Sequence, residues 1–305
     1  QIKAEGGIIG VPTFSDLDRQ YLSGLRAGDL VLLAARPGVG KTSMAINIAQ
    51  QAASKHGKTV AVFSLEMPKE QLVQRILCSE ARVDSDRVRK GMASKQDLRR
   101  LAKAVNILSG AELYINDTMK VSISDIRSQC RKLKLDHGLD LVVIDYVQLM
   151  QGTPGRRTEN RQLEVADISR SLKAMAKELD VPVLALSQLS RLAEQKNEEP
   201  NLSHLRESGA LEQDADVVIL LHRPRKTEED EDMEEQLKRN KHSETIEVIV
   251  AKHRNGPAGR LTMNFIKEFT LFTDFAQDWV GGSASLTPPP ETVIPPPPQD
   301  DEAPF

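Results

Sequence analysis

The sequence predicts an α/β protein with an open, mostly parallel sheet that carries helices on both faces. Short apolar runs alternate with helical patterns over most of the chain, which is typical of parallel sheets. Several of these runs are apolar at every position, as strands buried on both faces are. The last runs follow one another without a helix between them, which predicts antiparallel strands at the end of the sheet.

The composition excludes several classes of protein. The chain has 305 residues, of which 39% are hydrophobic and 28% charged, an ordinary globular composition. Its net charge of −3 means that any contact with nucleic acid must come from a local patch. Cys78 and Cys130 lie singly in helical patterns, which indicates buried thiols in a reducing compartment. No apolar run reaches membrane-spanning length and no signal peptide is recognisable, and the start at Gln1 suggests a fragment.

The first unit of the fold is a strand, a glycine turn and a helix. Residues 1–28 are a linker segment rich in Gly and turn residues, with apolar side chains that could pack on the core: Pro12, Phe14, Leu17, Tyr21 and Leu22. The apolar run 30–34 predicts the first strand, and the helix after the turn ends before Gly57, a suitable C′ residue. A second strand, 59–65, is apolar on both faces.

Helical patterns and short strands alternate through the middle of the chain. Pro68 begins a helix, and residues 84–109 predict one further helix with apolar residues at helical spacing, namely Leu98, Leu101, Ala102, Val105 and Leu108. Residues 113–115 predict a short strand, and Ser122 caps the next helix. The strand 139–144 leads through a polar loop, 151–161, to a long helix whose apolar residues step 3, 4, 3, 4: Val165, Ile168, Leu172, Met175 and Leu179.

The last third of the chain holds the remaining strands and three polar segments. The expected strands are residues 181–187, 216–221, 245–251, 261–266 and 271–275. Residues 189–213 form a long polar loop, and loops of this length within a domain are usually functional. Residues 226–240 form an acidic insertion. We therefore expect one domain over residues 29–280, followed by a disordered, proline-rich tail at 281–305.

The glycine turn at residues 35–42 (ARPGVGKT) has the composition of a phosphate-binding loop. Gly38 and Gly40 allow the backbone to curl so that N–H groups point inward, and the helix N-terminus adds positive partial charge. Lys41 would bind the β and γ phosphates, and the Thr42 hydroxyl would bind Mg²⁺. A chance glycine turn is the alternative, but the strand before and the helix after argue against it. The expected nucleotide contacts are Ala35, Pro37, Gly38, Val39, Gly40, Lys41, Thr42 and Ser43.

Three residues at strand ends are candidates for the chemistry, because ligands bind at the carboxyl ends of parallel strands. Asp145 could hold Mg²⁺ beside the phosphate loop, although an Asp after an apolar strand is common by itself. Glu66 could orient and deprotonate an attacking water, or it could simply favour a helix start. Gln188 could sense the γ-phosphate, or it could be a solvated amide.

Two later segments offer charges for phosphate groups. Lys252 and Arg254 are two residues apart and would continue the row of strand residues Ile246, Val248 and Val250. They could clamp the phosphate charge that develops in hydrolysis, within the chain or on a neighbouring subunit, or form a solvated strand end. Arg206 could bind a nucleic-acid phosphate and the Gly209 region could offer N–H groups, although a loop salt bridge is as good an interpretation of Arg206.

Six motifs together resemble the C-terminal motor domain of replicative DNA helicases of the DnaB type, a RecA-like P-loop NTPase family. The matching stretches occur in order, at residues 35–42, 63–67, 143–146, 186–191, 206–209 and 252–257, within a likeness that runs from about Gly10 to about Phe275. Ala35 in place of the first glycine is usual in that family.

The resemblance implies a cytoplasmic, replisome-associated homohexamer that threads single-stranded DNA and hydrolyses ATP with Mg²⁺ at subunit interfaces. Lys41 and Thr42 would bind phosphate and Mg²⁺, Asp145 would be the second Mg²⁺ ligand, and Glu66 the catalytic base. Gln188 would couple to the γ-phosphate, and Lys252 and Arg254 would reach the neighbour's ATP. The DNA channel would be lined by Arg206, Glu207 and Gly209 without sequence specificity, and Arg75 would stack on adenine.

The resemblance also implies partners and leaves alternatives. Primase and a helicase loader are partners in this family, and no membrane contact is expected. The family's N-terminal collar domain and linker helix are absent from this sequence, so ring assembly of the chain is an open question. A translocating helicase is the leading hypothesis. A RecA-like recombinase filament is the alternative, and an ATP-gated switch that binds only protein is a third.

Overall fold

The structure is a computed structural model that describes residues 9–118, 121–150, 161–189, 199–224 and 243–275. The acidic insertion at 226–240, the loop at 151–160 and the tail at 281–305 therefore lie outside the described residues.

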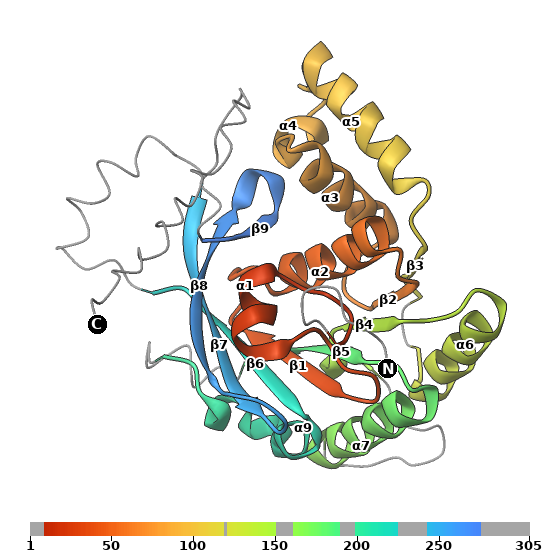
Figure 1. The fold of residues 1–305 in the computed structure, drawn as a ribbon, viewed down its shortest axis with the longest axis vertical. Helices are drawn as coiled ribbons and strands as arrows, with labels where there is room; N and C mark the ends of the chain where they lie inside the picture. The colour runs from red at the N-terminus through yellow and green to blue at the C-terminus, as the bar shows by residue number, and fades with distance from the viewer. Residues whose placement is uncertain (1–8, 119–120, 151–160, 190–198, 225–242, 276–305) are drawn as a thin grey trace, which may run out of the picture. The chain divides into compact units, whose positions relative to one another are not determined.

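Within the described residues, the strands form one sheet of nine in the order β3-β2-β4-β5-β1-β6-β7-β8-β9. The first six strands in this order are parallel, and β7, β8 and β9 add antiparallel pairs at one edge (Figure 1). The parallel strands are β1 (Leu30–Ala35), β2 (Val60–Ser64), β3 (Leu113–Asn116), β4 (Leu141–Asp145), β5 (Val183–Gln188) and β6 (Val217–His222). The antiparallel strands are β7 (Ser243–His253), β8 (Gly259–Ile266) and β9 (Leu271–Asp274). The predicted fold class is confirmed.

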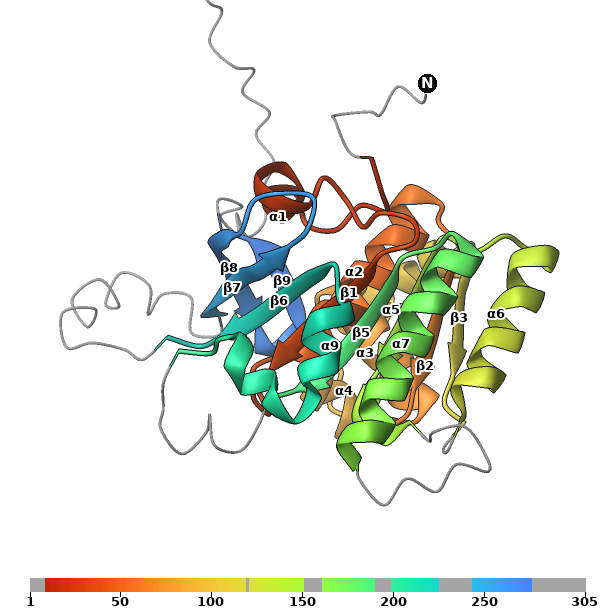
Figure 2. The ribbon, with the colours of Figure 1, turned by 90° about the horizontal axis from the view of Figure 1, so that it is seen from below.

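Helices cover both faces of the parallel part of the sheet (Figure 2). One face carries α2 (Lys41–His56) and α3 (Lys69–Ala81), and the other carries α6 (Ile123–Asp136), α7 (Arg161–Leu179) and α9 (Gly209–Asp214). Strand β1 shows why every position is apolar: Leu30, Leu32 and Ala34 pack on the α7 side, while Val31, Leu33 and Ala35 pack on the α2 side. No described helix is long and apolar enough to cross a membrane.

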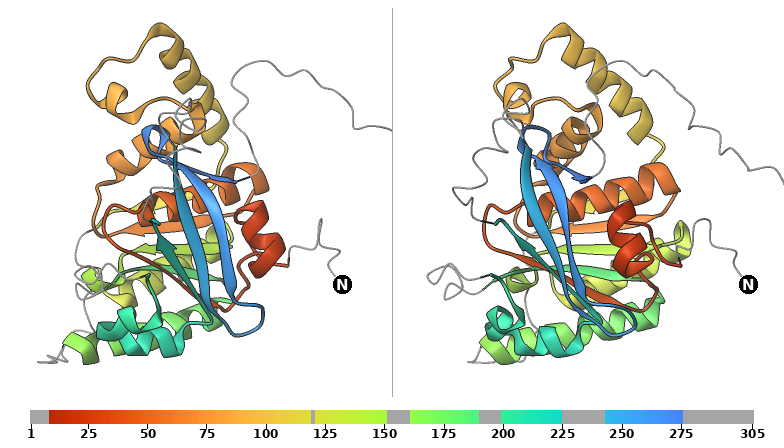
Figure 3. Two further views of the ribbon diagram at one scale, coloured as in Figure 1. Left: turned by 90° about the vertical axis from the view of Figure 1, so that its left-hand side faces the viewer. Right: turned by 60° about the vertical axis from the view of Figure 1, so that its left-hand side comes forward.

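The described part of the N-terminal segment, residues 9–28, packs on the core, as predicted. It forms α1 (Ser15–Leu17) and the π-helical turn η2 (Asp18–Leu22), which lie beside β8 and β9 (Figure 3). Phe14, Leu17 and Leu22 are buried, and the Phe14 ring lies 6.4 Å from that of Phe272. The Tyr21 hydroxyl donates a hydrogen bond to the Arg260 carbonyl at 2.8 Å. These contacts tie the start of the domain to its last strands.

The predicted single helix over residues 84–109 is wrong, because the structure has two helices there, α4 (Ser85–Arg89) and α5 (Lys95–Leu108). The chain turns at Lys90 and Gly91, and Ser94 then forms a capping box with Asp97 that starts α5. Ala104 is the only buried residue of α5, whose apolar face is largely exposed.

The predicted row of side chains along β7 is also wrong beyond Val250. A β-bulge interrupts the pairing with β6, since Val218 lies opposite Lys252 but Ile219 lies opposite Val250. The extra residue, Ala251, changes which face the next side chains take. Lys252 and Arg254 therefore reach α9, on the face opposite to that of Ile246, Val248 and Val250.

The long polar loop at 189–213 is partly helical where it is described. Residues 190–198 lie outside the description, but the remainder folds into the 3₁₀ helix η4 (Leu202–Ser208), capped by Asn201, and then into α9. Short 3₁₀ turns also occur at η3 (Val147–Leu149) and η5 (Lys267–Phe269). Leu205 and Leu211 anchor the η4–α9 segment against α7 and the sheet.

Candidate functional site

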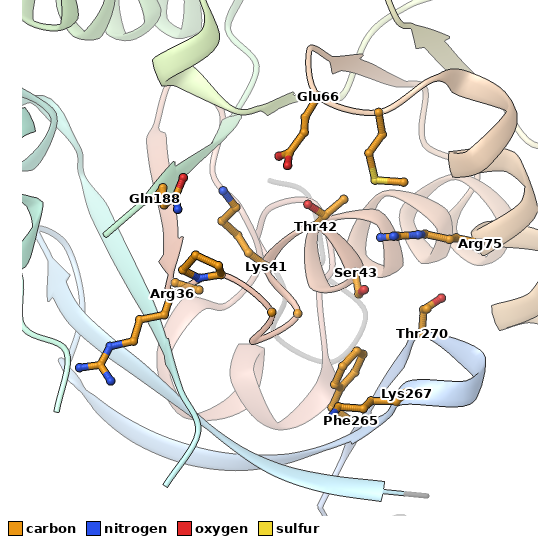
Figure 4. A pocket seen from close by; sticks show the side chains of 15 residues that line it. Arg36, Lys41, Thr42, Ser43, Glu66, Arg75, Gln188, Phe265, Lys267 and Thr270 are labelled. Carbon is orange, nitrogen blue, oxygen red and sulfur yellow. The ribbon is translucent and has the colours of Figure 1, made fainter. Parts of the chain in front are cut away.

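A pocket of about 440 Å³ opens at the carboxyl ends of β1, β2 and β5 (Figure 4). Its floor is the glycine turn between β1 and α2, as predicted. The residues that line it are Ala35, Arg36, Pro37, Gly38, Gly40, Lys41, Thr42, Ser43, Glu66, Met67, Arg75, Gln188, Phe265, Lys267 and Thr270. Of the predicted nucleotide contacts, only Val39 is not in this lining. Its side chain is buried in the core, so its backbone alone could contribute.

Gly40 gives the phosphate loop its shape. It is the N-cap residue of α2 and has φ +107°, a conformation that residues with a Cβ rarely adopt. A Cβ at Gly40 would lie 3.0 Å from ring atoms of Phe272, which itself stacks on Phe265 at 4.5 Å. The turn therefore packs directly on the β8–β9 edge, and the N–H groups at the start of α2 face the pocket.

Lys41 is a cation with no carboxylate in ion-pair range among the described residues. Its ammonium lies 4.7 Å from the centroid of the Tyr146 ring, at cation–π range. Burial lowers the pKa of Lys41, while the charges of Asp145 and Glu66 act in the opposite direction. A phosphate entering the pocket would supply the close anionic partner that the described residues do not.

Thr42 and Asp145 lie together as a magnesium site requires. The Thr42 hydroxyl donates a hydrogen bond to Asp145 Oδ2 at 2.7 Å, and Asp145 Oδ1 is buried with no hydrogen-bond partner among the described residues. Burial raises the pKa of Asp145, against the Thr42 hydrogen bond and the charges of Lys41 and Arg75. A hydroxyl and a carboxylate are the oxygen ligands that Mg²⁺ uses beside phosphates, so these residues fit the ion.

Glu66 and Gln188 both line the pocket, at the ends of strands on either side of β4. Figure 4 shows the Glu66 carboxylate turned toward the end of Lys41. Glu66 is exposed, so its carboxylate is accessible to water. Both side chains can therefore reach a ligand bound in the pocket, which is what a general base and a γ-phosphate sensor would need.

The pocket has a second wall that sequence reasoning missed. Arg75, from α3, was predicted to contact adenine and does line the pocket, where burial lowers its pKa. Next to it, Phe265, Lys267 and Thr270 line the pocket from β8 and the η5 turn, which contacts α3 (Figure 4). No local motif marks these residues. They reach the site only because β8 and β9 fold back against α2.

Lys252 and Arg254 do not approach the pocket of their own chain. Lys252 Nζ donates to the Glu212 carbonyl at 2.6 Å, and Arg254 Nη2 donates to the Gln213 carbonyl at 2.5 Å, both at the end of α9. Arg254 also pairs at 3.5 Å with Asp216, whose carboxylate accepts the N–H of Leu30 at the beginning of β1. Burial and the nearby Arg254 charge lower the pKa of Lys252.

These contacts place the two cations at the opposite end of the sheet from the phosphate loop. The loop follows the last residue of β1, and β1 rises roughly 17 Å over its length. The structure therefore excludes the within-chain alternative for Lys252 and Arg254 in this conformation.

The predicted DNA contacts are described only in part. Arg206 and Glu207 lie in the backbone of η4, and their side chains lie outside the described part of the chain. Gly209 is exposed and is the first residue of α9, the helix whose other end receives Lys252 and Arg254. Gly209, the last of the predicted DNA contacts, and the two cations thus lie at the two ends of one short helix.

Comparison with known proteins decides the family. The family model described as "DnaB-like helicase C terminal domain" matches residues 10–274. This chain belongs to the DnaB-like helicase C-terminal domain family. The match covers the whole sheet and every motif on which the resemblance was based, so the resemblance is confirmed.

Relatives of this DnaB-like domain are named as replicative helicases. The chain is 49% identical over 272 residues to "Replicative DNA helicase DnaB" of Geobacillus stearothermophilus, and 47% identical to "Replicative DNA helicase DnaC" of Bacillus subtilis (strain 168). Each alignment covers 88% of this chain and 58% of the relative. The DnaB-like domain thus spans a little under three fifths of the length of these curated relatives.

Solved structures show the same DnaB-like fold. One described as "ATPase Domain of G40P" has a TM-score of 0.77 at 39% identity and covers 89% of this chain and 93% of its own. Another, "The Structure Of A DnaB-Like Replicative Helicase And Its Interactions With Primase", has a TM-score of 0.78 at 39% identity and covers 89% of this chain and 65% of its own.

Proposed function

We propose that this chain is the ATP-hydrolysing motor of a replicative DNA helicase, which translocates on single-stranded DNA and unwinds duplex at the replication fork. One observation carries the proposal. The phosphate loop with its Thr42–Asp145 pair lies at one end of the sheet, and two cations lie at the other. We infer that each chain supplies its phosphate loop to one nucleotide site and its two cations to the site of a neighbour, as a subunit of a ring or filament motor would.

Each residue has a role that follows from its position. Lys41 binds the β and γ phosphates, while Thr42 and Asp145 hold Mg²⁺, which supplies charge neutralisation at the phosphates when it is bound. Glu66 orients the attacking water and accepts its proton, and Gln188 contacts the γ-phosphate from the end of β5. Ala35, Pro37, Gly38, Gly40 and Ser43 shape the loop, and Arg75 contacts the base. These roles are supported by the lining of one pocket and, for Asp145, by its hydrogen bond from Thr42.

The assembly we propose is a homohexamer in the full-length protein. Lys252 and Arg254 of each subunit would leave α9 and bind the nucleotide of the adjoining subunit, where an arginine finger is worth roughly 10³- to 10⁵-fold in rate. The segment from Arg206 through Glu207 to Gly209, at the beginning of α9, would bind the DNA backbone. A structural relative described with primase supports a primase partner, and work at the replication fork implies the cytoplasm.

The recombinase alternative has less support. Both fold types share the phosphate loop and the parallel sheet, but the relatives reported above are named as replicative helicases. Closed hexameric rings in negative-stain images would favour the helicase, and open filaments on DNA would favour the recombinase.

Lys41→Ala tests the nucleotide site. We expect it to reduce ATP hydrolysis by at least a hundredfold, because the phosphates lose their main point charge. Lys55→Ala, at the exposed far end of the same helix, is the matched control and should hydrolyse ATP normally. Both are measured with and without single-stranded DNA. Normal hydrolysis by Lys41→Ala would contradict the site, and hydrolysis that DNA never stimulates would favour the protein-only switch.

A further inference from the structure

Arg223, directly after β6, contacts the phosphate loop from outside the pocket. Its Nη2 donates a hydrogen bond to the Gly38 carbonyl at 2.8 Å, across a sequence separation of 185 residues. β6 is the parallel neighbour of β1, so the end of β6 and the loop that follows β1 lie side by side. Gly38 is a lining residue of the nucleotide pocket and has φ +75°.

Glu244, near the start of β7, holds Arg223 in this position. Arg223 Nε lies 2.9 Å from Glu244 Oε2, so the guanidinium faces the carboxylate on one side and the loop carbonyl on the other. The other carboxylate oxygen of Glu244 pairs with Lys267 Nζ. Lys267 lines the opposite wall of the same pocket, on the η5 turn (Figure 4). One carboxylate thus connects the phosphate end of the pocket with its second wall.

The hydrogen bond to Gly38 constrains the part of the loop that matters for phosphate binding. In a planar trans peptide, the carbonyl of Gly38 and the N–H of Val39 point in opposite directions, so a donor that fixes the carbonyl also fixes the N–H. The N–H side of this peptide has a longer contact of its own, from Val39 N–H to the Arg36 carbonyl at 3.4 Å, so the 2.8 Å bond from Arg223 is the shorter of the two that hold it. A loop that is already shaped before the nucleotide arrives binds it more tightly, because less ordering remains to be done.

We propose that Arg223 is a positioning residue for the phosphate loop, held by Glu244, which couples the loop to Lys267 on the opposite wall. This inference rests on the proposed function, since it assumes that the pocket binds a nucleotide. It names three residues outside the six motifs, none of which the sequence analysis selected. An arginine suits this position because its planar guanidinium donates to the Gly38 carbonyl in a fixed direction while its charge lies beside Glu244, whereas a lysine ammonium is a point charge on a flexible stem.

The effect should fall on binding and not on folding. The Arg223 side chain is 39% exposed and that of Glu244 is 32% exposed, and ion pairs of this exposure contribute little to stability. Loss of one charge-assisted hydrogen bond that shapes the loop corresponds to about a tenfold loss of nucleotide affinity.

The test compares Arg223→Gln, Arg223→Lys and Glu244→Gln with the control Arg260→Gln. Arg260 forms a 2.9 Å ion pair with Glu199, is 57% exposed, and lies outside the pocket lining. Each protein is titrated with a fluorescent ADP analogue to measure its affinity. The melting temperature and the hydrogen exchange of residues 36–44 are measured on the same proteins without nucleotide. We expect Arg223→Gln and Arg223→Lys to bind about tenfold more weakly and to exchange faster in the loop at an unchanged melting temperature. Glu244→Gln should show a smaller loss, and adding it to Arg223→Gln should cost less than it costs alone, because part of its effect passes through Arg223 and the rest through Lys267.

Two results would overturn the inference. The inference is wrong if Arg223→Gln binds the ADP analogue with wild-type affinity and exchanges loop hydrogens at the wild-type rate. It is also wrong if Arg223→Lys behaves like the wild type, because a positive charge alone would then be enough. A wild-type chain that binds no nucleotide would instead overturn the proposed function, and this inference with it.

Discussion

At the scale of single residues, the phosphate loop was predictable because its chemistry is local. Gly38, Gly40, Lys41 and Thr42 lie within five consecutive residues, and each type has a separate physical reason to be there. The second wall of the pocket was not predictable. Phe265 and Thr270 come from the far end of the chain, and their types are common in any strand or turn. Only the tertiary packing of β8 and β9 brings them to the site.

Gly40→Ala is the sharpest single-residue test of the loop. The added Cβ meets the Phe272 ring at 3.0 Å and the φ of +107° is strained, so we expect a loss of about 2 kcal/mol in stability together with loss of nucleotide binding. Gly57→Ala is the control at the other end of α2, where φ is +60° and no atom lies within 4 Å of the new Cβ. It should cost about 1 kcal/mol and leave binding intact. Urea denaturation and nucleotide titration measure both, and equal binding by the two variants would refute this account of Gly40.

The two cysteines should be unreactive in the folded protein. Burial, with a smaller contribution from Asp84, raises the pKa of Cys78 to about 11, and burial raises that of Cys130 to about 12. Since the thiolate is the reactive form, both thiols should resist a disulfide reagent at pH 8 and react fully in denaturant. Rapid reaction of either thiol in the native state would show that the thiol is accessible to solvent and contradict this prediction.

At the scale of elements, the pattern of apolar residues predicted which segments are helical but not how they pack. The spacing in α5 resembles that in α7, yet Leu98 of α5 is 57% exposed while Leu172 of α7 is completely buried. Periodicity reports a helix with an apolar face, and only the arrangement of neighbouring elements decides whether that face is covered. The β-bulge at Ala251 is the other example, because one unpaired residue reversed the face predicted for Lys252 and Arg254.

This difference between α5 and α7 can be measured. We expect Leu98→Ala to change the free energy of unfolding by less than about 0.5 kcal/mol, since the side chain has little to lose. Leu172→Ala removes the same atoms from the core and should cost about 2–5 kcal/mol. Chemical denaturation of the two variants compares them directly. A cost for Leu98→Ala near that of Leu172→Ala would mean that the α5 face is covered in solution.

At the scale of the whole molecule, the sheet separates two sets of residues that the proposed reaction would need. Lys41 lies beyond the carboxyl end of β1, and Arg254 lies beside Asp216 at the beginning of the same strand. The sequence predicted both sets but left open whether they act within one chain. The two sets cannot meet within a single subunit in this conformation, because no side chain spans the roughly 17 Å between the ends of β1. The central claim is therefore that each nucleotide site is shared between two chains.

Mixing two inactive chains tests this claim most directly. Arg254→Ala lacks the cation but keeps the phosphate loop, and Lys41→Ala has the reverse defect. Melting temperatures first establish that each variant folds, since Arg254 also pairs with Asp216. In mixed assemblies, some interfaces combine an intact loop with an intact cation, so we predict that ATP hydrolysis returns in part. Mixed assemblies that form and yet stay as inactive as either variant alone would contradict the shared site.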